Sequence, residues 1–211
     1  MKTVSVLGAT GSIGDSTLDV VARHPERYRV HTLTACRNVD KLLALAQRHR
    51  PEVVAIAHAP AAAGVEARLR SAGVKARLAV GADELAEVAG TPGVDLVMAA
   101  IVGAAGLAPT LAAARAAKAL LLANKESIVM AGALFARTCR ESGVALLPVD
   151  SEHNAIFQVL EEHQRHAVER IILTASGGPF RDFTREQMAA VTPEIAAAHP
   201  NWSMGIKISI D

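Results

Sequence analysis

The stretch Gly8-Ala9-Thr10-Gly11-Ser12-Ile13-Gly14 directly follows a short apolar segment, rich in β-forming residues, at positions 3–7. Apolar residues at helical spacing, among them Leu18 and Val21, come next, and Pro25 ends that pattern. This order predicts a strand, a glycine turn and a helix. Glycines in such a turn let the backbone approach a pyrophosphate, whose charge the free amides of the helix N-terminus can bind. The motif therefore indicates dinucleotide binding, although glycine turns between a strand and a helix also occur for packing reasons.

Strands and helices alternate along the next part of the chain. Apolar, β-rich segments predict further strands at 28–34, 53–57, 96–99, 119–123 and 144–149. Helical periodicity predicts helices at 39–48, 61–71, 83–89, from about 107 onward, and at 128–141. Such alternation requires a parallel sheet with right-handed crossovers. Residues 1–149 are therefore predicted to form a Rossmann-like, doubly wound α/β domain.

The pattern changes after this domain. The sequence predicts a helix at about 154–163, a strand at 170–175, a Gly/Pro loop at 176–179, a short helix from Thr184, and then a polar and aromatic run at 199–205. Residues 150–211 are therefore predicted to begin a second α/β domain.

Composition argues against several classes of protein. The 22 basic and 21 acidic residues give a formal net charge of +1 and are scattered, which argues against binding to nucleic acid or a membrane surface. Cys36 and Cys139 form no CxxC pair, and a strand so close to Met1 leaves no room for a signal segment, so we expect a reducing cytoplasm. The uncharged stretch 96–114 approaches the length of a membrane span. Because two glycines and Pro109 interrupt it, we predict a buried strand, a turn and a helix there.

The second predicted strand ends in Thr34-Ala35-Cys36-Arg37-Asn38. Domains that bind NAD carry Asp or Glu at this point to bind the ribose 2′-hydroxyl, and that acid is absent here. Arg37 instead offers a planar, permanently charged group suited to the 2′-phosphate of NADP, with Asn38 as a neutral companion. A solvated loop arginine is the alternative.

Two carboxylates, Asp150 and Glu152, follow the last strand of the predicted first domain. Side chains two apart on a strand point the same way, and oxygen ligands at the carboxyl edge of an α/β sheet suit Mg²⁺ or Mn²⁺. At least one further ligand must come from elsewhere, because two carboxylates do not complete a site. The alternative is a helix N-terminus, in which Asp150 or Ser151 caps the helix and Glu152 complements its dipole.

Further polar residues suit a phosphorylated substrate. Lys125, in Asn124-Lys125-Glu126-Ser127 after another strand, would face the carboxylate pair across the crevice. Ser176 opens the Gly/Pro loop and could present its hydroxyl to a phosphate. His199 and Trp202 lie on a segment whose composition suits a lid that closes over substrate, and an ordinary loop is the alternative.

Six strings of this sequence resemble those of the 1-deoxy-D-xylulose 5-phosphate reductoisomerases, and together they run from end to end of the chain. They are GATGSIG at 8–14, VMAAIVGAAGL at 97–107, LLANKES at 121–127, LLPVDSEHNAIFQ at 146–158, SGGPF at 176–180 and HPNWSMG at 199–205. The resemblance implies the NADPH-dependent conversion of 1-deoxy-D-xylulose 5-phosphate to 2-C-methyl-D-erythritol 4-phosphate in non-mevalonate isoprenoid biosynthesis. It also implies dependence on Mg²⁺ or Mn²⁺ and a homodimer for the complete enzyme.

The resemblance further implies roles for single residues. NADPH contacts are implied for Thr10, Gly11, Ser12, Ile13, Arg37, Asn38, Asn124, Glu126 and Gly205. Metal binding is implied for Asp150 and Glu152, and substrate contacts for Lys125, Ser151, Glu152, Ser176 and His199. Trp202 would cover the substrate, and a part in catalysis is implied for Lys125, Glu152, His199 and Trp202.

The family pattern continues beyond Asp211 with a third carboxylate ligand of the metal, further phosphate-binding residues and a helical domain. This chain is therefore expected to bind NADPH and to be catalytically incomplete. A stand-alone NADPH-binding module without catalysis is the second hypothesis.

Overall fold

The computed structural model of the chain describes residues 1–174 and 178–198. The chain divides into two compact units, Met1–Gln158 and Val159–Asp211. The domain boundary that we expect after residue 149 stays a prediction.

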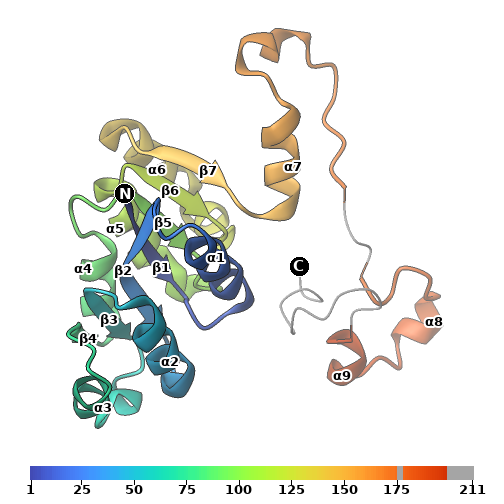
Figure 1. The fold of residues 1–211 in the computed structure, drawn as a ribbon. Helices are drawn as coiled ribbons and strands as arrows, with labels where there is room; N and C mark the ends of the chain where they lie inside the picture. The colour runs from blue at the N-terminus through green and yellow to red at the C-terminus, as the bar shows by residue number, and fades with distance from the viewer. Residues whose placement is uncertain (175–177, 199–211) are drawn as a thin grey trace. The chain divides into compact units, whose positions relative to one another are not determined.

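A parallel sheet forms the centre of the first unit (Figure 1). Its strands are β1 (Lys2–Leu7), β2 (Tyr28–Ala35), β3 (Val53–Ile56), β4 (Arg77–Val80), β5 (Leu96–Ala99), β6 (Ala119–Leu122) and β7 (Ala145–Pro148). They lie in the order β4-β3-β2-β1-β5-β6-β7, and every neighbouring pair is parallel. The strand order reverses between β1 and β5, and ligands of such sheets bind outside the carboxyl ends of the strands at that point. The predicted doubly wound α/β fold is confirmed.

Helices cover both faces of the sheet. One face packs against α1 (Ser12–Arg23), α2 (Val39–His49) and α3 (Val65–Ser71), and the other against α4 (Ala82–Ala89), α5 (Leu107–Ala116) and α6 (Glu126–Ser142). Alternate residues of β3 point to the two faces of the sheet. Val54 and Ile56 lie in the core that contains α1 to α3, and Val53 and Ala55 lie in the core that contains α4. Burial on both faces explains why these strands are apolar at nearly every position.

Two differences from the predicted elements lie around residues 59–80. The single helix expected at 61–71 is wrong, because Gly64, with φ of 72°, divides the segment into the 3₁₀ turn η1 (Ala59–Ala62) and α3. Strand β4 was not predicted. It is short, lies at an edge of the sheet and fully buries only Ala79, so its sequence has no strong apolar pattern.

The uncharged stretch at 96–114 forms β5, the 3₁₀ turn η2 (Ala104–Gly106) and most of α5, as expected. Among residues 1–174 and 178–198, no helix combines the length and hydropathy needed to cross a membrane.

The chain after residue 150 departs further from the predicted elements. Helix α7 (Ser151–Val159) begins and ends earlier than the helix expected at 154–163, and the 3₁₀ turn η3 (Glu162–Ala167) follows it. Residues 170–174 form no strand, and Ile171, Ile172 and Leu173 are 65%, 72% and 69% exposed. A single strand is not stable without a neighbour to share its backbone hydrogen bonds, and in the described part of the chain none pairs with this segment.

Two short helices lie near the end of the described chain. Helix α8 (Arg185–Met188) confirms the helix predicted from Thr184, whose side chain forms a capping box with Gln187. Helix α9 (Pro193–Ala196), which was not predicted, begins with a similar cap from Thr192.

Asp95 joins three strands at the amino edge of the sheet. Its carboxylate accepts hydrogen bonds from Lys118 Nζ at 2.6 Å and from the backbone N and the hydroxyl of Thr3 at 2.8 and 3.1 Å. The Lys118 bond first, and then the Thr3 bonds, lower the pKa of Asp95 to about 2. The carboxylate therefore connects β1, β5 and β6.

Asp95→Asn should lower the free energy of unfolding at pH 7 by about 1–2 kcal/mol, because hydrogen bonds to a charged group are lost. The folded-state pKa lies below the value of roughly 3.9 in unfolded chains. The contribution is therefore present above about pH 4 and is lost as the pH falls toward about 2. Urea unfolding of both proteins at several pH values measures this, with Glu66→Gln, which removes an exposed ion pair to Arg70, as control. A difference that stays constant down to pH 3 would contradict the prediction.

Candidate functional site

The residues singled out from the sequence follow the carboxyl ends of neighbouring strands. Arg37 follows β2, the glycine loop follows β1, Lys125 follows β6 and Asp150 follows β7. Because the strands are parallel and adjacent in the order β2-β1-β5-β6-β7, these segments meet at one edge of the sheet.

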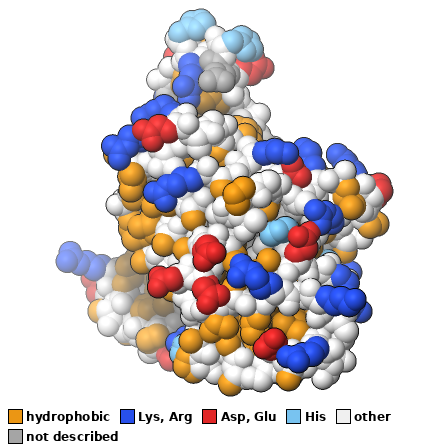
Figure 2. All heavy atoms as spheres, turned by 90° about the vertical axis from the view of Figure 1, so that its left-hand side faces the viewer, with side chains coloured by type: hydrophobic (Ala, Val, Ile, Leu, Met, Phe, Trp, Pro, Cys, Tyr) orange, Lys and Arg blue, Asp and Glu red, His pale blue; other side chains and the backbone are white. Residues whose placement is uncertain are grey.

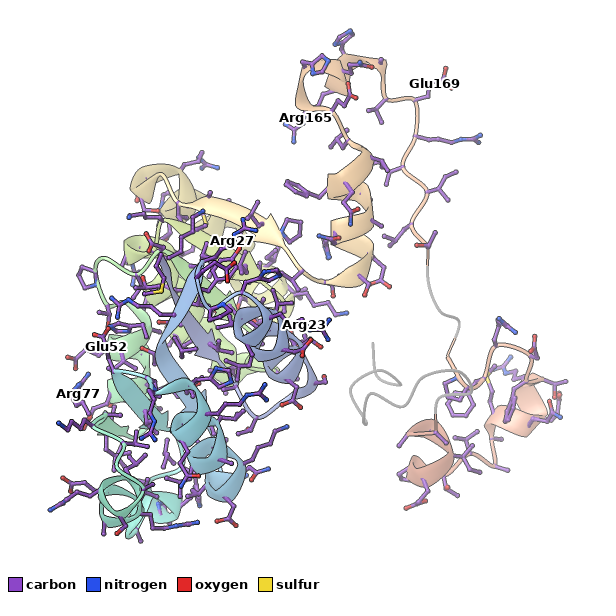
Figure 3. All side chains as sticks on the ribbon, in the orientation of Figure 1. Arg23, Arg27, Glu52, Arg77, Arg165 and Glu169 are labelled. Atoms are coloured by element: carbon purple, nitrogen blue, oxygen red, sulfur yellow. The ribbon has the colours of Figure 1, made fainter. Side chains whose placement is uncertain are left out.

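The opposite, amino edge carries charges with a structural explanation. Arg27, Glu52 and Arg77 lie there, just before or at the start of β2, β3 and β4 (Figure 3). Glu52 forms an exposed ion pair with Arg29, and such pairs contribute little. Figure 2 shows basic and acidic side chains mixed over the face that it presents, in agreement with the balanced composition.

The glycine loop is shaped by close backbone contacts. A Cβ at Gly8, where φ is +84°, would lie 2.6 Å from the carbonyl oxygen of Ala100, and a Cβ at Gly14 would lie 2.5 Å from that of Ala9. Packing therefore requires both glycines. Gly11 differs, because it precedes α1 and offers no side chain to cap it. The amides of the first turn of α1 thus have no side-chain acceptor, which fits an incoming phosphate.

The end of β2 holds the loop in place and presents Arg37 beside it. The hydroxyl of Thr34 accepts a hydrogen bond from Gly8 N at 2.9 Å, and its carbonyl accepts one from Ala9 N at 2.8 Å. Arg37 is exposed, and its guanidinium has no ion pair or hydrogen bond with any residue that the structure describes. Asn38 caps α2 by accepting from Lys41 N at 3.2 Å. Its side chain thus has a structural task as well as the cofactor contact that we predict.

Lys41 is a residue of this region that sequence reasoning missed. Its Nζ lies 3.1 Å from the carbonyl oxygen of Thr10 and 2.6 Å from a carboxylate oxygen of Asp15. Its spacing of four from Arg37, at the start of a helix, is the only signal in the sequence.

Asn124 and Glu126 form hydrogen bonds with the loop after β5. The buried Asn124 amide donates to the carbonyls of Ile101 at 2.5 Å and Gly103 at 3.1 Å, and its oxygen accepts from the amide and hydroxyl of Ser127. All four hydrogen-bonding positions of that side chain are therefore used, so a cofactor contact must come from the Asn124 backbone. Glu126 accepts from Gly103 N through Oε1 at 3.1 Å.

The second carboxylate oxygen of Glu126 is an orphan. Oε2 is buried and has no hydrogen-bond partner among the described residues. A buried acceptor without a donor is costly. Its position beside the loop after β5 fits a donor supplied by a bound ligand.

Asp150 lies at this edge with a side chain that is only 9% exposed. Lys125 Nζ lies 3.2 Å from Oδ2, and His153 Nδ1 lies 2.7 Å from Oδ1. Burial favours the neutral acid, but the hydrogen bonds and charges of His153 and Lys125 outweigh it and lower the pKa of Asp150. The meeting of Lys125 and Asp150 across the strand ends agrees with the sequence analysis.

Glu152 does not share the geometry that we expected. It lies in the first turn of α7, whereas the prediction that Asp150 and Glu152 point the same way assumed a strand. Residues two apart on a helix do not face each other, so that reason is wrong. The two carboxylates still suit a hard cation, but the described residues contain no group of three His, Cys, Asp or Glu able to hold a metal. A metal site that includes Asp150 and Glu152 therefore stays a prediction.

The other residues predicted for the substrate and cofactor sites are Ser151, Ser176, His199, Trp202 and Gly205. Ser151 is exposed at the start of α7. Ser176, His199, Trp202 and Gly205 lie outside the described residues.

Comparison with known proteins gives the family. The family description "1-deoxy-D-xylulose 5-phosphate reductoisomerase" matches residues 4–132, and the description of its C-terminal domain matches residues 146–211. A reductoisomerase of this name from Ralstonia nicotianae is 56% identical over 214 residues, which cover 100% of this chain and 54% of that protein. One from Burkholderia vietnamiensis is 58% identical over 212 residues, covering 100% and 53%. The chain spans about half the length of these relatives.

Solved structures agree. A crystal structure of DOX-P reductoisomerase in complex with NADPH, fosmidomycin and magnesium matches with a TM-score of 0.94 and 47% identity, over 100% of this chain and 54% of that one. The enzyme from Zymomonas mobilis in complex with NADPH matches with a TM-score of 0.87 and 52% identity, over 100% and 53%. Both comparisons extend from the glycine loop to the end of the chain, and this chain therefore belongs to the 1-deoxy-D-xylulose 5-phosphate reductoisomerase family.

Proposed function

We propose that these residues are the NADPH-binding part and the beginning of the catalytic part of an enzyme that converts 1-deoxy-D-xylulose 5-phosphate to 2-C-methyl-D-erythritol 4-phosphate. The observation that carries the proposal is the single sheet edge that holds the glycine loop, Arg37, Lys125 and Asp150. We propose residues 1–149 as the cofactor domain and 150–211 as the start of the metal and substrate domain. The family relation supports the further proposals of a cytoplasmic homodimer and of isoprenoid biosynthesis as its pathway.

NADPH is the proposed cofactor, supported by its presence in two related structures. The first-turn amides of α1 and the residues Thr10 to Ile13 would bind the pyrophosphate. Arg37 would bind the 2′-phosphate through a charge-assisted pair, with Asn38 beside it. The orphan Oε2 of Glu126 would accept a hydrogen bond from a hydroxyl of the nucleotide, and Asn124 and Gly205 complete the proposed contacts.

Substrate is proposed to bind beyond the carboxyl ends of β6 and β7. Asp150 and Glu152 would hold a divalent metal, magnesium being present in a related structure. When bound, NADPH would supply the hydride and the metal would polarise the substrate carbonyl. Lys125 forms an ion pair with Asp150 at this edge and would orient the substrate oxygens, while Ser151, Ser176 and His199 would contact the remainder. Trp202 would cover the substrate and exclude water.

Arg37→Ala should weaken NADPH binding and spare NADH, because only NADPH carries the 2′-phosphate. Losing one charge-assisted pair costs about 1.5–3 kcal/mol, which is roughly 10- to 150-fold in dissociation constant. Fluorescence titration of both nucleotides against wild type and variant measures this. Arg70→Ala, which removes an exposed arginine of α3, is the control. Equal losses for NADPH and NADH would reject the role of Arg37.

A further inference from the structure

Lys41 connects three parts of the cofactor end of the sheet. Its ammonium bonds the carbonyl of Thr10, in the middle of the glycine loop, and the carboxylate of Asp15, in the first turn of α1. Its backbone amide donates to Asn38, the residue directly after Arg37. The loop, the start of α1 and the start of α2 therefore all contact one residue.

We propose that Lys41 is a positioning residue for the dinucleotide, which holds the glycine loop in its phosphate-binding shape and cancels the charge of Asp15. The inference rests on the proposed binding of NADPH and adds a residue to it. Lys41 acts through the loop. Its loss should therefore weaken NADPH and NADH alike, unlike the loss of Arg37.

The contact with Thr10 is the first reason. The loop has Gly8 and Gly11 within four positions, so its own side chains restrain it little. A hydrogen bond at 3.1 Å from a charged donor on another helix restrains the carbonyl of Thr10, and with it the direction of the next amides. Those amides are the groups that would meet the pyrophosphate.

The charge of Asp15 is the second reason. A carboxylate in the first turn of α1 complements the helix dipole while the site is empty, but it repels an arriving phosphate. Lys41 lies 2.6 Å from that carboxylate and neutralises it. Without Lys41, an uncompensated negative charge would stand beside the phosphate site.

A purely structural ion pair is the competing explanation. The side chains of Lys41 and Asp15 are 35% and 49% exposed, and exposed pairs of this kind contribute little to stability. The chain offers a matched control, because Arg68 Nη2 and Asp40 Oδ1 form another exposed pair between helices, also at 2.6 Å, that does not contact the loop. Substitutions in the two pairs therefore separate an effect on the position of the loop from an effect on the stability of the protein.

The test compares Lys41→Met, Lys41→Arg, Asp15→Asn, the double variant Asp15→Asn/Lys41→Met, and Arg68→Met. Titration of the 211-residue chain with NADPH and with NADH should show dissociation constants raised about tenfold for both nucleotides in Lys41→Met. Lys41→Arg should restore most of the affinity, and Arg68→Met should leave it unchanged. Asp15→Asn should not weaken binding, and the double variant should stay several-fold weaker than Asp15→Asn alone, because the Thr10 contact is missing.

Hydrogen exchange of the amides of Gly8, Ala9 and Gly11, which are hydrogen-bonded in the loop, gives a second readout in nucleotide-free protein that does not depend on the proposed function. Exchange should be several-fold faster in Lys41→Met and unchanged in Arg68→Met, while residues of β1 keep their protection. Unchanged loop exchange in Lys41→Met, or a double variant that binds as tightly as Asp15→Asn alone, would overturn the inference. A wild-type chain that binds no NADPH would refute the proposed function, and the exchange rates would still decide whether Lys41 orders the loop.

Discussion

Asp150→Asn should abolish turnover of 1-deoxy-D-xylulose 5-phosphate by the full-length enzyme while leaving its affinity for NADPH nearly unchanged. Asp150 is a largely enclosed carboxylate that meets Lys125 and His153, and these two neighbours lower its pKa. The amide has almost the same shape and lacks the negative charge that a divalent cation requires. We expect kcat to fall at least about 100-fold, or about 2.7 kcal/mol in activation free energy.

Steady-state rates at saturating Mg²⁺ and Mn²⁺, together with NADPH titration, measure this loss. The control is Asp19→Asn, which removes an exposed carboxylate paired with Arg23 on α1. If Asp150→Asn keeps its activity at saturating metal, the metal-binding role is wrong, and the alternative that Asp150 caps the start of α7 is favoured. A parallel loss of NADPH affinity would show that the substitution disturbs the whole sheet edge.

The isolated 211-residue chain should bind NADPH and fail to turn over substrate. The glycine loop, Arg37 and three buried clusters that support them lie in the first unit, so the cofactor site has its own core. The described residues contain no group of three His, Cys, Asp or Glu able to hold a metal, and the chain spans about half the length of its relatives. Groups that act together in catalysis are not additive, so we expect a rate at least roughly a thousandfold below that of the full-length enzyme.

Exposed apolar residues also support the expectation that the isolated chain does not turn over substrate. Ile171, Ile172 and Leu173 are mostly exposed, and such apolar surface favours association. NADPH fluorescence and NADPH oxidation with Mn²⁺, measured beside the full-length enzyme, decide the matter. Turnover comparable to that of the full-length enzyme would show that residues outside this chain are dispensable. If the intact mass of the natural protein corresponds to 211 residues, the hypothesis of a stand-alone NADPH-binding module is favoured.

The sequence by itself was enough to determine the α/β architecture and the order of its main elements. Local patterns carry that information: apolar runs of strand length, helical spacing and a glycine turn directly after β1. Parallel alternation then places the carboxyl ends at one edge, which brought Lys125 and Asp150 together correctly. Strand β4 was not predicted, because an edge strand with one fully buried residue has no apolar run of strand length.

Only the tertiary structure decided how the individual side chains act. The bonds from the Asn124 amide nitrogen to Ile101 and Gly103, and the bond from Lys41 to Thr10, join segments more than 20 positions apart. The buried oxygen of Glu126 that lacks a hydrogen-bond partner likewise depends on how such segments pack. No local pattern encodes these contacts. The place of Glu152 on a helix and the absence of a strand at 170–174 have the same cause, because the hydrogen bonds that define each element depend on which neighbours the folded chain supplies.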